Sequence, residues 1–499
     1  MSDSAIVVGS GPNGLAAAIR LAEARRPVVV LEAADRPGGA VRTEELTLPG
    51  FLHDTFSSVY PAGAASPVFA RMGLERHGLE WVQPAACSAH PLPGGRAIAL
   101  YRDIDATAAS IDRTHPGDGA GWSDYVSPLL ERFDAVRAMM LSGFPPVGGA
   151  LRLTAQGPRQ ALRFAALVPD TATRLARRLF AGADARAWLY GAAMHGDVPP
   201  GGPGSAIAVA YLNLLGHAVG WPSPRGGAER LTDALVVHLR ELGGEVRCGA
   251  RVTAIHARQR RVTGVTIEGG ERVPASIVVA DVMPHALVEL AGEDLPAAYR
   301  ALLNRYRYGP ATVKVDWALD GPIPWEAPEA REAGTVHLGG GEQELLGAIA
   351  AARRGSPERP FLLLGQQTIA DPSRAPAGKH TAWAYTHGSR DLDWARETPH
   401  WVQRMEAHVE HYAPGFRARI LARHVLGPAE LQARDANLVG GDVGGGTYRL
   451  DQVLFRPLPA PSPYRTPIRG LVIGSAATFP GGAVHGVPGD AAARAALRR

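Results

Sequence analysis

The feature that most constrains this chain is a glycine-rich turn between two apolar runs at its start. Residues 5–8 form a short apolar run typical of a buried strand, and a Gly-x-Gly-x-x-Gly turn follows directly at residues 9–14. Residues 15–26 are rich in alanine and predict a helix, and residues 28–32 predict the next strand. A glycine turn between a strand and a helix, followed by a second strand, is typical of a dinucleotide-binding βαβ unit.

Each residue type in this turn has a physical reason. Gly9, Gly11 and Gly14 allow a tight turn and let the backbone approach a pyrophosphate closely. The helix that starts at Pro12 and Asn13 directs its positive N-terminus at the same group. We therefore predict that all five residues contact a dinucleotide.

A carboxylate completes the unit. Glu32 ends the second strand, about 20 residues after the turn, where an acid accepts hydrogen bonds from ribose hydroxyls. Ala33 follows it and is expected beside the same nucleotide. A chance glycine turn is the alternative, but such a turn would not require a strand, a helix and an acid in register.

A second glycine segment favours FAD over NAD. The sequence Arg-Pro-Gly-Gly-Ala-Val-Arg-Thr at residues 36–43 follows the acid and has no counterpart in many NAD-binding domains. Gly38 and Gly39 can pass close to a diphosphate and a flavin, and Arg42 can neutralise phosphate charge. These three residues are therefore predicted to bind FAD, and the alternative is a simple surface turn.

The end of the chain carries a third glycine-rich segment. A short apolar strand at residues 471–474 leads into a loop, and an alanine-rich helix follows at about residues 489–497. We expect the loop to cover the ribityl chain and the ring of the flavin, with the helix N-terminus favouring the negative charge of the reduced ring. The predicted contacts are Gly474, Ser475, Gly482 and Val484.

These segments assign the chain to the α/β class. Residues 86–223 are mostly helical in pattern, residues 245–280 are rich in strands, and residues 296–464 mix both. The chain is therefore expected to leave the nucleotide-binding domain and return to it twice. The predicted architecture is a discontinuous Rossmann-like FAD-binding domain of residues 1–85, 224–295 and 465–499, interleaved with an α+β substrate domain of residues 86–223 and 296–464 that includes a helical insert.

Composition excludes several other classes. The net charge of +4 comes from scattered arginines without interleaved aromatic residues, so we predict no nucleic-acid partner. Two cysteines cannot form a disulfide framework, and no Cys/His cluster in the sequence predicts a metal site. We expect no secretion signal, because no charged segment with an apolar run is seen before the first strand, and the longest apolar run, residues 206–221, is interrupted by Asn213 and His217. A cytoplasmic enzyme is the expectation, while peripheral membrane contact and oligomeric state stay open.

Two absences constrain the electron acceptor. No second Gly-x-Gly-x-x-Gly turn follows another strand, and the sequence has no Cys-x-x-x-x-Cys pair. We therefore expect neither an NAD(P)H domain nor a disulfide relay. Oxygen, a quinone or another protein is expected to take the electrons of reduced FAD.

A set of short segments is similar to those of one flavoprotein family. These segments are residues 9–14, 38–39, 217–222, 224–235, 314–317, 374–380, 383–385, 440–442 and 480–482. Together they resemble the phytoene-desaturase-related FAD-dependent oxidoreductases, in particular a bacterial branch described as NAD(P)/FAD-dependent, over nearly the whole chain. The resemblance implies an amine-oxidase-like fold with the substrate domain over the flavin, and an adenine-side contact from Val252. Ser475 departs from the family, because many members have an acidic residue there.

Two residues are candidates for catalysis. Lys314 lies in an alternating strand pattern, and the resemblance implies a lysine beside the flavin. A buried lysine can lose its proton whereas an arginine cannot, and the chain has only one other lysine, Lys379. His485 lies in the C-terminal glycine loop and can shuttle a proton or bind substrate. The alternatives are an exposed strand lysine and a histidine bonded to backbone.

Three residues are predicted to bind the substrate. Trp383 and Tyr385 alternate on a strand, so their rings face the same side and can form an aromatic wall. His217 lies in the helical insert with His195 and Trp221 and can line the pocket. Ordinary core packing is the alternative for all of them.

The predicted activity is dehydrogenation of a mostly apolar small molecule. An apolar pocket would hold a C–H bond of the substrate beside flavin N5, and a hydride would pass from carbon to the flavin. An amine or imine oxidase differs only in its substrate and is the first alternative. A redox-neutral flavin isomerase and a non-catalytic FAD-bound interaction protein are the others.

Overall fold

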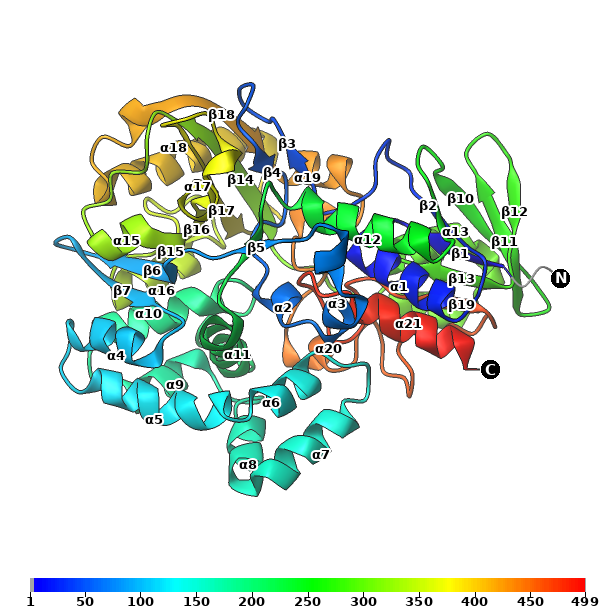
Figure 1. The fold of residues 1–499 in the computed structure, drawn as a ribbon, viewed down its shortest axis with the longest axis horizontal. Coiled ribbons are helices and arrows are strands. Elements are labelled where there is room, and N and C mark those ends of the chain that lie inside the picture. Colours follow the sequence, from blue (N-terminus) through cyan, green and yellow to red (C-terminus); the bar gives the residue numbers. More distant parts are fainter. Residues whose placement is uncertain (1–3, 499) are drawn as a thin grey trace.

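The computed structural model describes residues 4–498, which form two units lying side by side (Figure 1). The unit on the right of the view contains a five-stranded parallel sheet and both chain ends. The unit on the left contains a seven-stranded mixed sheet and most of the helices. The fold is therefore the α/β architecture expected from the sequence.

The parallel sheet joins strands from three distant parts of the chain. Its order is β19-β13-β1-β2-β9, and every neighbouring pair is parallel. The strands are β1 (Ala5–Val8), β2 (Val28–Leu31), β9 (Glu245–Arg247), β13 (Ile277–Ala280) and β19 (Leu471–Ile473). All five come from the segments predicted for the FAD-binding domain, whose boundaries stay a prediction.

Both faces of this sheet are buried, as the apolar runs predict. Ala5 and Val7 pack on one side with helices α1 (Pro12–Glu23), α12 (Glu229–Glu241) and α21 (Val487–Leu497). Ile6 and Val8 pack on the other side with the antiparallel strands β10 (Val252–Arg258), β11 (Arg261–Ile267) and β12 (Arg272–Pro274), which form a separate sheet, and with α13 (Pro284–Ala291). This alternation is typical of a parallel sheet covered on both faces.

The second unit is built around the seven-stranded sheet. Its order is β18-β14-β17-β16-β15-β6-β7, and all pairs are antiparallel except β15 with β6. The strands are β6 (Ala86–Leu92), β7 (Arg96–Leu100), β14 (Ala311–Leu319), β15 (Ala333–Leu338), β16 (Leu362–Gly365), β17 (His380–Gly388) and β18 (Ile420–Leu426). Helix α18 (Trp394–Tyr412) covers one face through Met405 and Val409, which leaves the other face toward the helical insert.

The helical insert expected within residues 86–223 consists of several short helices. The helices are α4 (Ile104–Asp112), α5 (Asp118–Leu130), α6 (Phe133–Met140), α7 (Val147–Gln156), α8 (Pro158–Ala166), α9 (Ala172–Leu179), α10 (Ala183–Ala193) and α11 (Ser205–Val219). Breaks such as those at Pro169 and Gly182 separate these helices, because both residue types disfavour helix interiors. Residues 206–221 form most of α11, and no helix within residues 4–498 is long and apolar enough to cross a membrane.

The remaining elements are short helices, 3₁₀ helices and two-residue strands of both units. They are β3 (Thr43–Glu44), β4 (His53–Asp54), α2 (Pro61–Ala64), α3 (Pro67–Met72), the 3₁₀ helix η1 (Leu74–His77), β5 (Trp81–Val82), β8 (Ser223–Pro224), η2 (Gly292–Asp294), α14 (Ala297–Leu303), α15 (Pro328–Glu332), α16 (Glu342–Ala351), α17 (Gln367–Ala370), η3 (Pro372–Arg374), η4 (Arg417–Arg419), α19 (Pro428–Arg434), η5 (Val439–Gly441) and α20 (Leu450–Val453).

Candidate active site

One large cavity runs from the parallel sheet to the helical insert. Its volume is about 1400 Å³, and its walls come from both units. Ligand pockets in proteins usually measure about 300–1,000 Å³. The cavity therefore has room for a large cofactor and a second molecule beside it.

The first glycine turn forms one end of this cavity. Gly9, Gly11, Pro12 and Asn13 line it, and Gly9 has a φ of +95°, in the region that favours glycine. Gly14 does not line the cavity. Its amide donates a hydrogen bond of 2.8 Å to Asp281 Oδ2, and a Cβ there would collide with the carbonyl oxygen of Gly9. Gly14 therefore keeps strand and helix close together instead of contacting a ligand.

The second glycine segment lies against the first. Gly39 lines the cavity, and a Cβ on it would lie 3.0 Å from Gly11 Cα. Gly38 lies behind it with a φ of +126° and donates to the carbonyl oxygen of Ser10 at 3.2 Å. Two glycine backbones thus approach each other at the N-terminus of α1, which leaves an open space at the helix end.

Two buried polar atoms beside this space fit a diphosphate. Arg42 lines the cavity, and its Nε has no hydrogen-bond acceptor among the described residues. Asn13 also lines the cavity, and its Oδ1 has no partner there either. Buried polar groups in folded proteins are nearly always bonded, so unpartnered ones indicate a missing ligand. A cation and a helix N-terminus at one point are the groups that a diphosphate needs.

The nucleotide end of the cavity has the predicted acid. Glu32 is buried and lines the cavity with Ala33. Its Oε2 accepts bonds from the Ser10 amide at 2.9 Å and the Ser10 hydroxyl at 2.5 Å, whereas its Oε1 accepts from the Ala34 amide at 2.8 Å and keeps a lone pair for a ribose hydroxyl. Val252 lines the same end from the start of β10, as the family resemblance implies. This end therefore fits the adenosine half of FAD.

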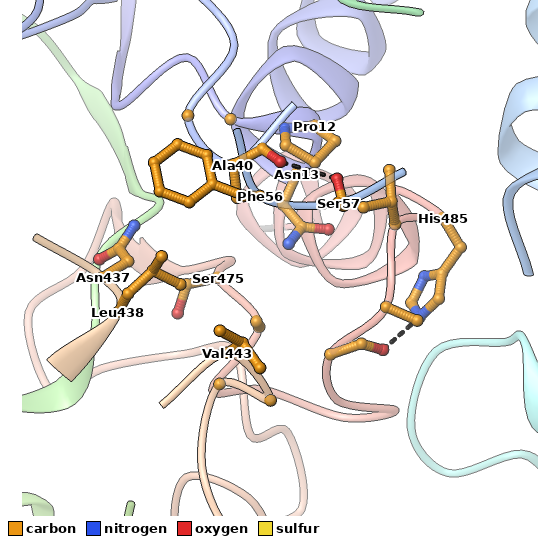
Figure 2. A pocket seen from close by; sticks show the side chains of 18 of the residues that line it. Pro12, Asn13, Ala40, Phe56, Ser57, Asn437, Leu438, Val443, Ser475 and His485 are labelled. Atoms are coloured by element: carbon orange, nitrogen blue, oxygen red, sulfur yellow. Dashed lines mark hydrogen bonds between the residues drawn. The ribbon is translucent and has the colours of Figure 1, made fainter. Parts of the chain in front are cut away.

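The C-terminal loop closes the cavity next to the N-terminal turn. Ser475, Gly482 and Val484 line it, and Figure 2 shows Ser475 and Asn13 around the same space. Gly474 lies outside, because a Cβ there would be 2.9 Å from Ala492 Cβ on α21. Helices α1 and α21 also pack closely, since a Cβ on Gly489 would collide with the carbonyl oxygen of Asn13. The two ends of the chain therefore form one site.

His485 lines the cavity, but its ring nitrogens bond to its own loop. Nε2 lies 3.2 Å from the carbonyl oxygen of Gly482, drawn as a dashed line in Figure 2, and Nδ1 accepts from the Val487 amide at 3.2 Å. Burial lowers the pKa of His485 to about 4, so the ring is neutral. The alternative considered for this residue, a histidine bonded to backbone, is the arrangement found. His485 shapes the loop and has no free nitrogen for proton transfer.

Lys314 lies on the cavity wall, and it is buried, not exposed. It is only 3 % exposed, and its ammonium group forms an ion pair with Asp316, which follows on the same face of β14. Asp316 is fully buried, and burial raises its pKa to about 6 in spite of Lys314. His53 Nδ1 lies 3.7 Å from Asp316 Oδ1, and His53 Nε2 lies 2.7 Å from Thr47 Oγ1. A polar chain thus leads from the cavity wall to the half-buried Thr47.

The aromatic wall predicted from the strand pattern is present. Trp383 and Tyr385 both line the cavity, with ring centroids 5.8 Å apart and planes 6° from parallel. Tyr385 pairs with Lys314 across the sheet, so the wall lies next to the buried lysine. Gly365 makes room for the wall, because a Cβ there would collide with the ring of Trp383. The prediction that both rings face the same side is confirmed.

His217 does not reach the cavity. Its Nε2 accepts a bond of 3.1 Å from Trp122 Nε1, and its Nδ1 lies 3.1 Å from the carbonyl oxygen of Arg102. This residue therefore packs in the core of the helical insert, which corrects the expectation that it contacts substrate. His195, the other histidine expected near the pocket, lines the cavity instead, and its Nε2 lies 2.8 Å from His337 Nε2.

The end of the cavity farthest from the glycine turn is apolar. It is lined by side chains of the helical insert, which include Met139, Met140, Leu141, Phe144, Ile207, Leu212 and Leu215. The acidic residues on the described cavity wall are Glu32, Asp281, Glu289 and Asp435, all in or against the nucleotide-binding unit. An apolar chamber without a carboxylate suits an uncharged apolar molecule.

The sequence reasoning missed the acids and the amide beside the diphosphate space. Asp281 directly follows β13, and burial raises its pKa to about 8, with Asp435 and Glu32 adding to the shift. Asn437 joins this group, because its Nδ2 donates to the Asp281 carbonyl oxygen at 3.0 Å. The apolar run at residues 277–280 pointed to a strand, and the acid at its C-terminal end was the available signal.

Comparisons with known proteins agree with this geometry. The family model for flavin-containing amine oxidoreductases matches residues 13–496. The chain is 27% identical to pyridine nucleotide-disulfide oxidoreductase domain-containing protein 2 of Rattus norvegicus, over 99% of this chain and 93% of the relative. It is 26% identical to the lycopene-forming phytoene desaturase of a Paracoccus species, over 99% of this chain and 96% of the relative. The crystal structure of an oxidoreductase from Methanosarcina mazei has a similar fold, with a TM-score of 0.67, 16% identity, and coverage of 99% of this chain and 100% of that one.

Proposed function

Because the chain belongs to the flavin-containing amine oxidoreductase family and FAD is its cofactor, we propose that it dehydrogenates a C–H bond of a mostly apolar small molecule. The broader assignment, an FAD-dependent oxidoreductase, follows from the family itself. The proposal concerns the substrate class and the reaction at carbon.

The observation that carries the proposal is the apolar chamber beside the cofactor space. Met140, Phe144, Ile207 and Leu212 belong to its lining, and the acids on the described wall lie at the other end. Burying an apolar molecule there is favourable by roughly 25 cal/mol for each Å² removed from water. A charged amine would lose hydration without gaining a partner, so the chamber favours an uncharged substrate.

The positions of the residues indicate which step of the reaction each of them would support. When bound, FAD supplies a two-electron acceptor for a hydride. Trp383, Tyr385 and the apolar chamber position the substrate, and the C-terminal loop and the helical insert exclude water. Lys314 can pass its proton to Asp316 and then take up a proton that the substrate releases from the carbon next to the oxidised one. Burial brings the pKa of Asp316 closer to neutral pH, which makes this exchange less costly.

Anaerobic mixing with matched donors tests the proposal. Purified holoenzyme would be mixed with isoprenoid hydrocarbons and with primary amines on the same carbon skeletons, while flavin absorbance is followed. We expect the hydrocarbons to bleach the flavin and the amines to leave it oxidised. Bleaching by the amines alone, with peroxide release in air, would establish the amine oxidase alternative. A flavin that no donor bleaches would indicate the redox-neutral or non-catalytic alternatives.

Turnover also needs an electron acceptor. The proposal retains oxygen, a quinone or a protein for this step, because no second dinucleotide turn accompanies the first in the sequence. Mixing reduced holoenzyme with air-saturated buffer and, separately, with a soluble quinone would rank the first two by the rate at which the flavin absorbance returns.

A further inference from the structure

Three potential metal ligands meet on the nucleotide-binding unit, outside the cavity. They are His77 at the end of η1, and His238 and Glu241 in the last turn of α12. One ligand atom from each side chain lies within 4.8 Å of the other two. None of the three is among the described residues that line the cavity, so the cluster is separate from the space for FAD and substrate.

The backbone holds these side chains in place. Gly73 and Gly78, whose backbones adopt the left-handed conformation, flank the short helix η1, which carries His77. His238 and Glu241 are three positions apart, so they lie on one face of α12. η1 packs directly against α12. The cluster is therefore formed by the fold and not by chance rotamers of distant surface residues.

The three groups face one another closely. His77 Nδ1 lies 3.5 Å from Glu241 Oε1, and the rings of His77 and His238 have centroids 4.8 Å apart with planes 32° apart. His238 Nδ1 is buried and has no hydrogen-bond partner among residues 4–498. The His77 side chain is 7% exposed whereas that of Glu241 is 60% exposed, so an ion can reach the cluster from the carboxylate side.

Two imidazoles and one carboxylate form the donor set of this cluster. A neutral imidazole has a nitrogen lone pair available for a metal ion. The Glu241 carboxylate supplies negative charge for a divalent cation, whereas the nearby Glu23 is paired with Arg20 and Arg71.

We propose that His77, His238 and Glu241 bind a divalent zinc-type cation through two imidazole nitrogens and one carboxylate oxygen. Imidazole with carboxylate suits zinc and the later transition metals, whereas calcium and magnesium prefer oxygen ligands alone. Three protein ligands leave the fourth tetrahedral position to water, on the exposed side of Glu241.

The cation would join η1 to the end of α12, and α12 supports the cofactor cradle. Thr232 Oγ1 of α12 donates to the carbonyl oxygen of Val41 at 2.9 Å, and the Glu229 amide donates to Thr43 Oγ1 at 3.1 Å. These bonds hold the segment that includes Gly39 and Arg42. Fixing the far end of α12 therefore stabilises the helix on which this segment rests.

The test uses the holoenzyme after treatment with a chelator and removal of that chelator. Zinc chloride would be titrated by calorimetry into the wild type, E241Q and H238Q, with H411Q as control because His411 is an exposed histidine on α18. We expect one zinc ion per chain in the wild type and in H411Q, and an affinity at least about 100-fold lower in E241Q and H238Q. Glu241 is exposed, so E241Q is expected to fold normally.

Thermal unfolding and a spectroscopic probe complete the test. Zinc should raise the unfolding midpoint of the wild type by about 2 °C or more and leave that of E241Q unchanged. Cobalt in place of zinc should give the intense visible bands of a four-coordinate site. No binding to the wild type, or binding that is unchanged in both E241Q and H238Q, would overturn the proposal.

Discussion

The two ends of the cavity are built from different parts of the chain. The cofactor end is made largely of backbone, in which Gly9, Gly11 and Gly39 meet at the start of α1. The substrate end is made of side chains, such as Ile207 and Leu212, that come from helices of the insert. Backbone geometry tolerates almost no change of residue, whereas an apolar wall accepts many. The cofactor end is therefore expected to be intolerant of mutation, and the substrate end to be adjustable.

The largest expected effect is at the cofactor end. In Gly14→Ala the new Cβ would collide with the carbonyl oxygen of Gly9. The turn must open, so we expect FAD affinity to fall more than about 100-fold, measured by titration of apoprotein with FAD. Gly347→Ala in α16 is the control, because its Cβ would meet nothing within 4 Å. Equal FAD affinity in both variants would show that the cofactor end of the cavity is not intolerant of mutation.

The second prediction concerns the wall between the two ends. Lys314→Met should slow anaerobic flavin reduction by about 10²–10⁴-fold, because the proton acceptor is lost, while FAD remains bound. Lys379→Met is a matched control, since Lys379 is the only other lysine and pairs with Asp320 at the surface. If the Lys314 variant reduces its flavin at the wild-type rate, Lys314 is a structural lysine.

The third prediction tests whether the substrate end is adjustable. Leu212→Ala removes apolar surface from the chamber, and we expect kcat/KM for an apolar donor to fall about tenfold with FAD affinity unchanged. Leu162→Ala serves for comparison, because Leu162 is 72% exposed on α8. A loss of FAD from the Leu212 variant would show that the two ends are not independent.

The smallest expected effect comes from pH at the cofactor end. Burial raises the pKa of Asp281 to about 8, so its carboxyl group is protonated below that pH and gains a negative charge as pH rises through it. A charge there repels a diphosphate and also destabilises the folded state. We expect FAD affinity to fall roughly threefold between pH 7 and 9 in the wild type and to stay level in Asp281→Asn. The same decline in both proteins would assign it to another group.

The sequence predicted the cofactor end better than the substrate end, because backbone geometry requires particular residues whereas an apolar wall does not. A glycine turn between a strand and a helix has few alternatives, so Gly9, Gly11 and Glu32 could be placed from spacing. Strand alternation placed Trp383 and Tyr385 on one side, and the structure confirms it. The remaining wall brings together residues from distant segments, and periodicity does not reveal which of them meet.

The errors have the same origin. His217 and His195 both lie in the helical insert, but α11 turns His217 toward Trp122 while His195 lines the cavity. Gly14 has a packing role because the carbonyl oxygen of Gly9 lies where its Cβ would be. The cluster of His77 with α12 was missed because His77 is far in sequence from His238 and Glu241. Each of these depends on tertiary contacts.

A crystal structure of the FAD complex tests the central claim most directly. The account predicts that the diphosphate lies at the N-terminus of α1, within hydrogen-bonding distance of the Gly11 amide and Arg42. The flavin ring should lie between the loop of residues 475–485 and the wall that carries Lys314 and Tyr385. Electron density for the flavin ring at the Val252 end, or for the diphosphate away from α1, would contradict it.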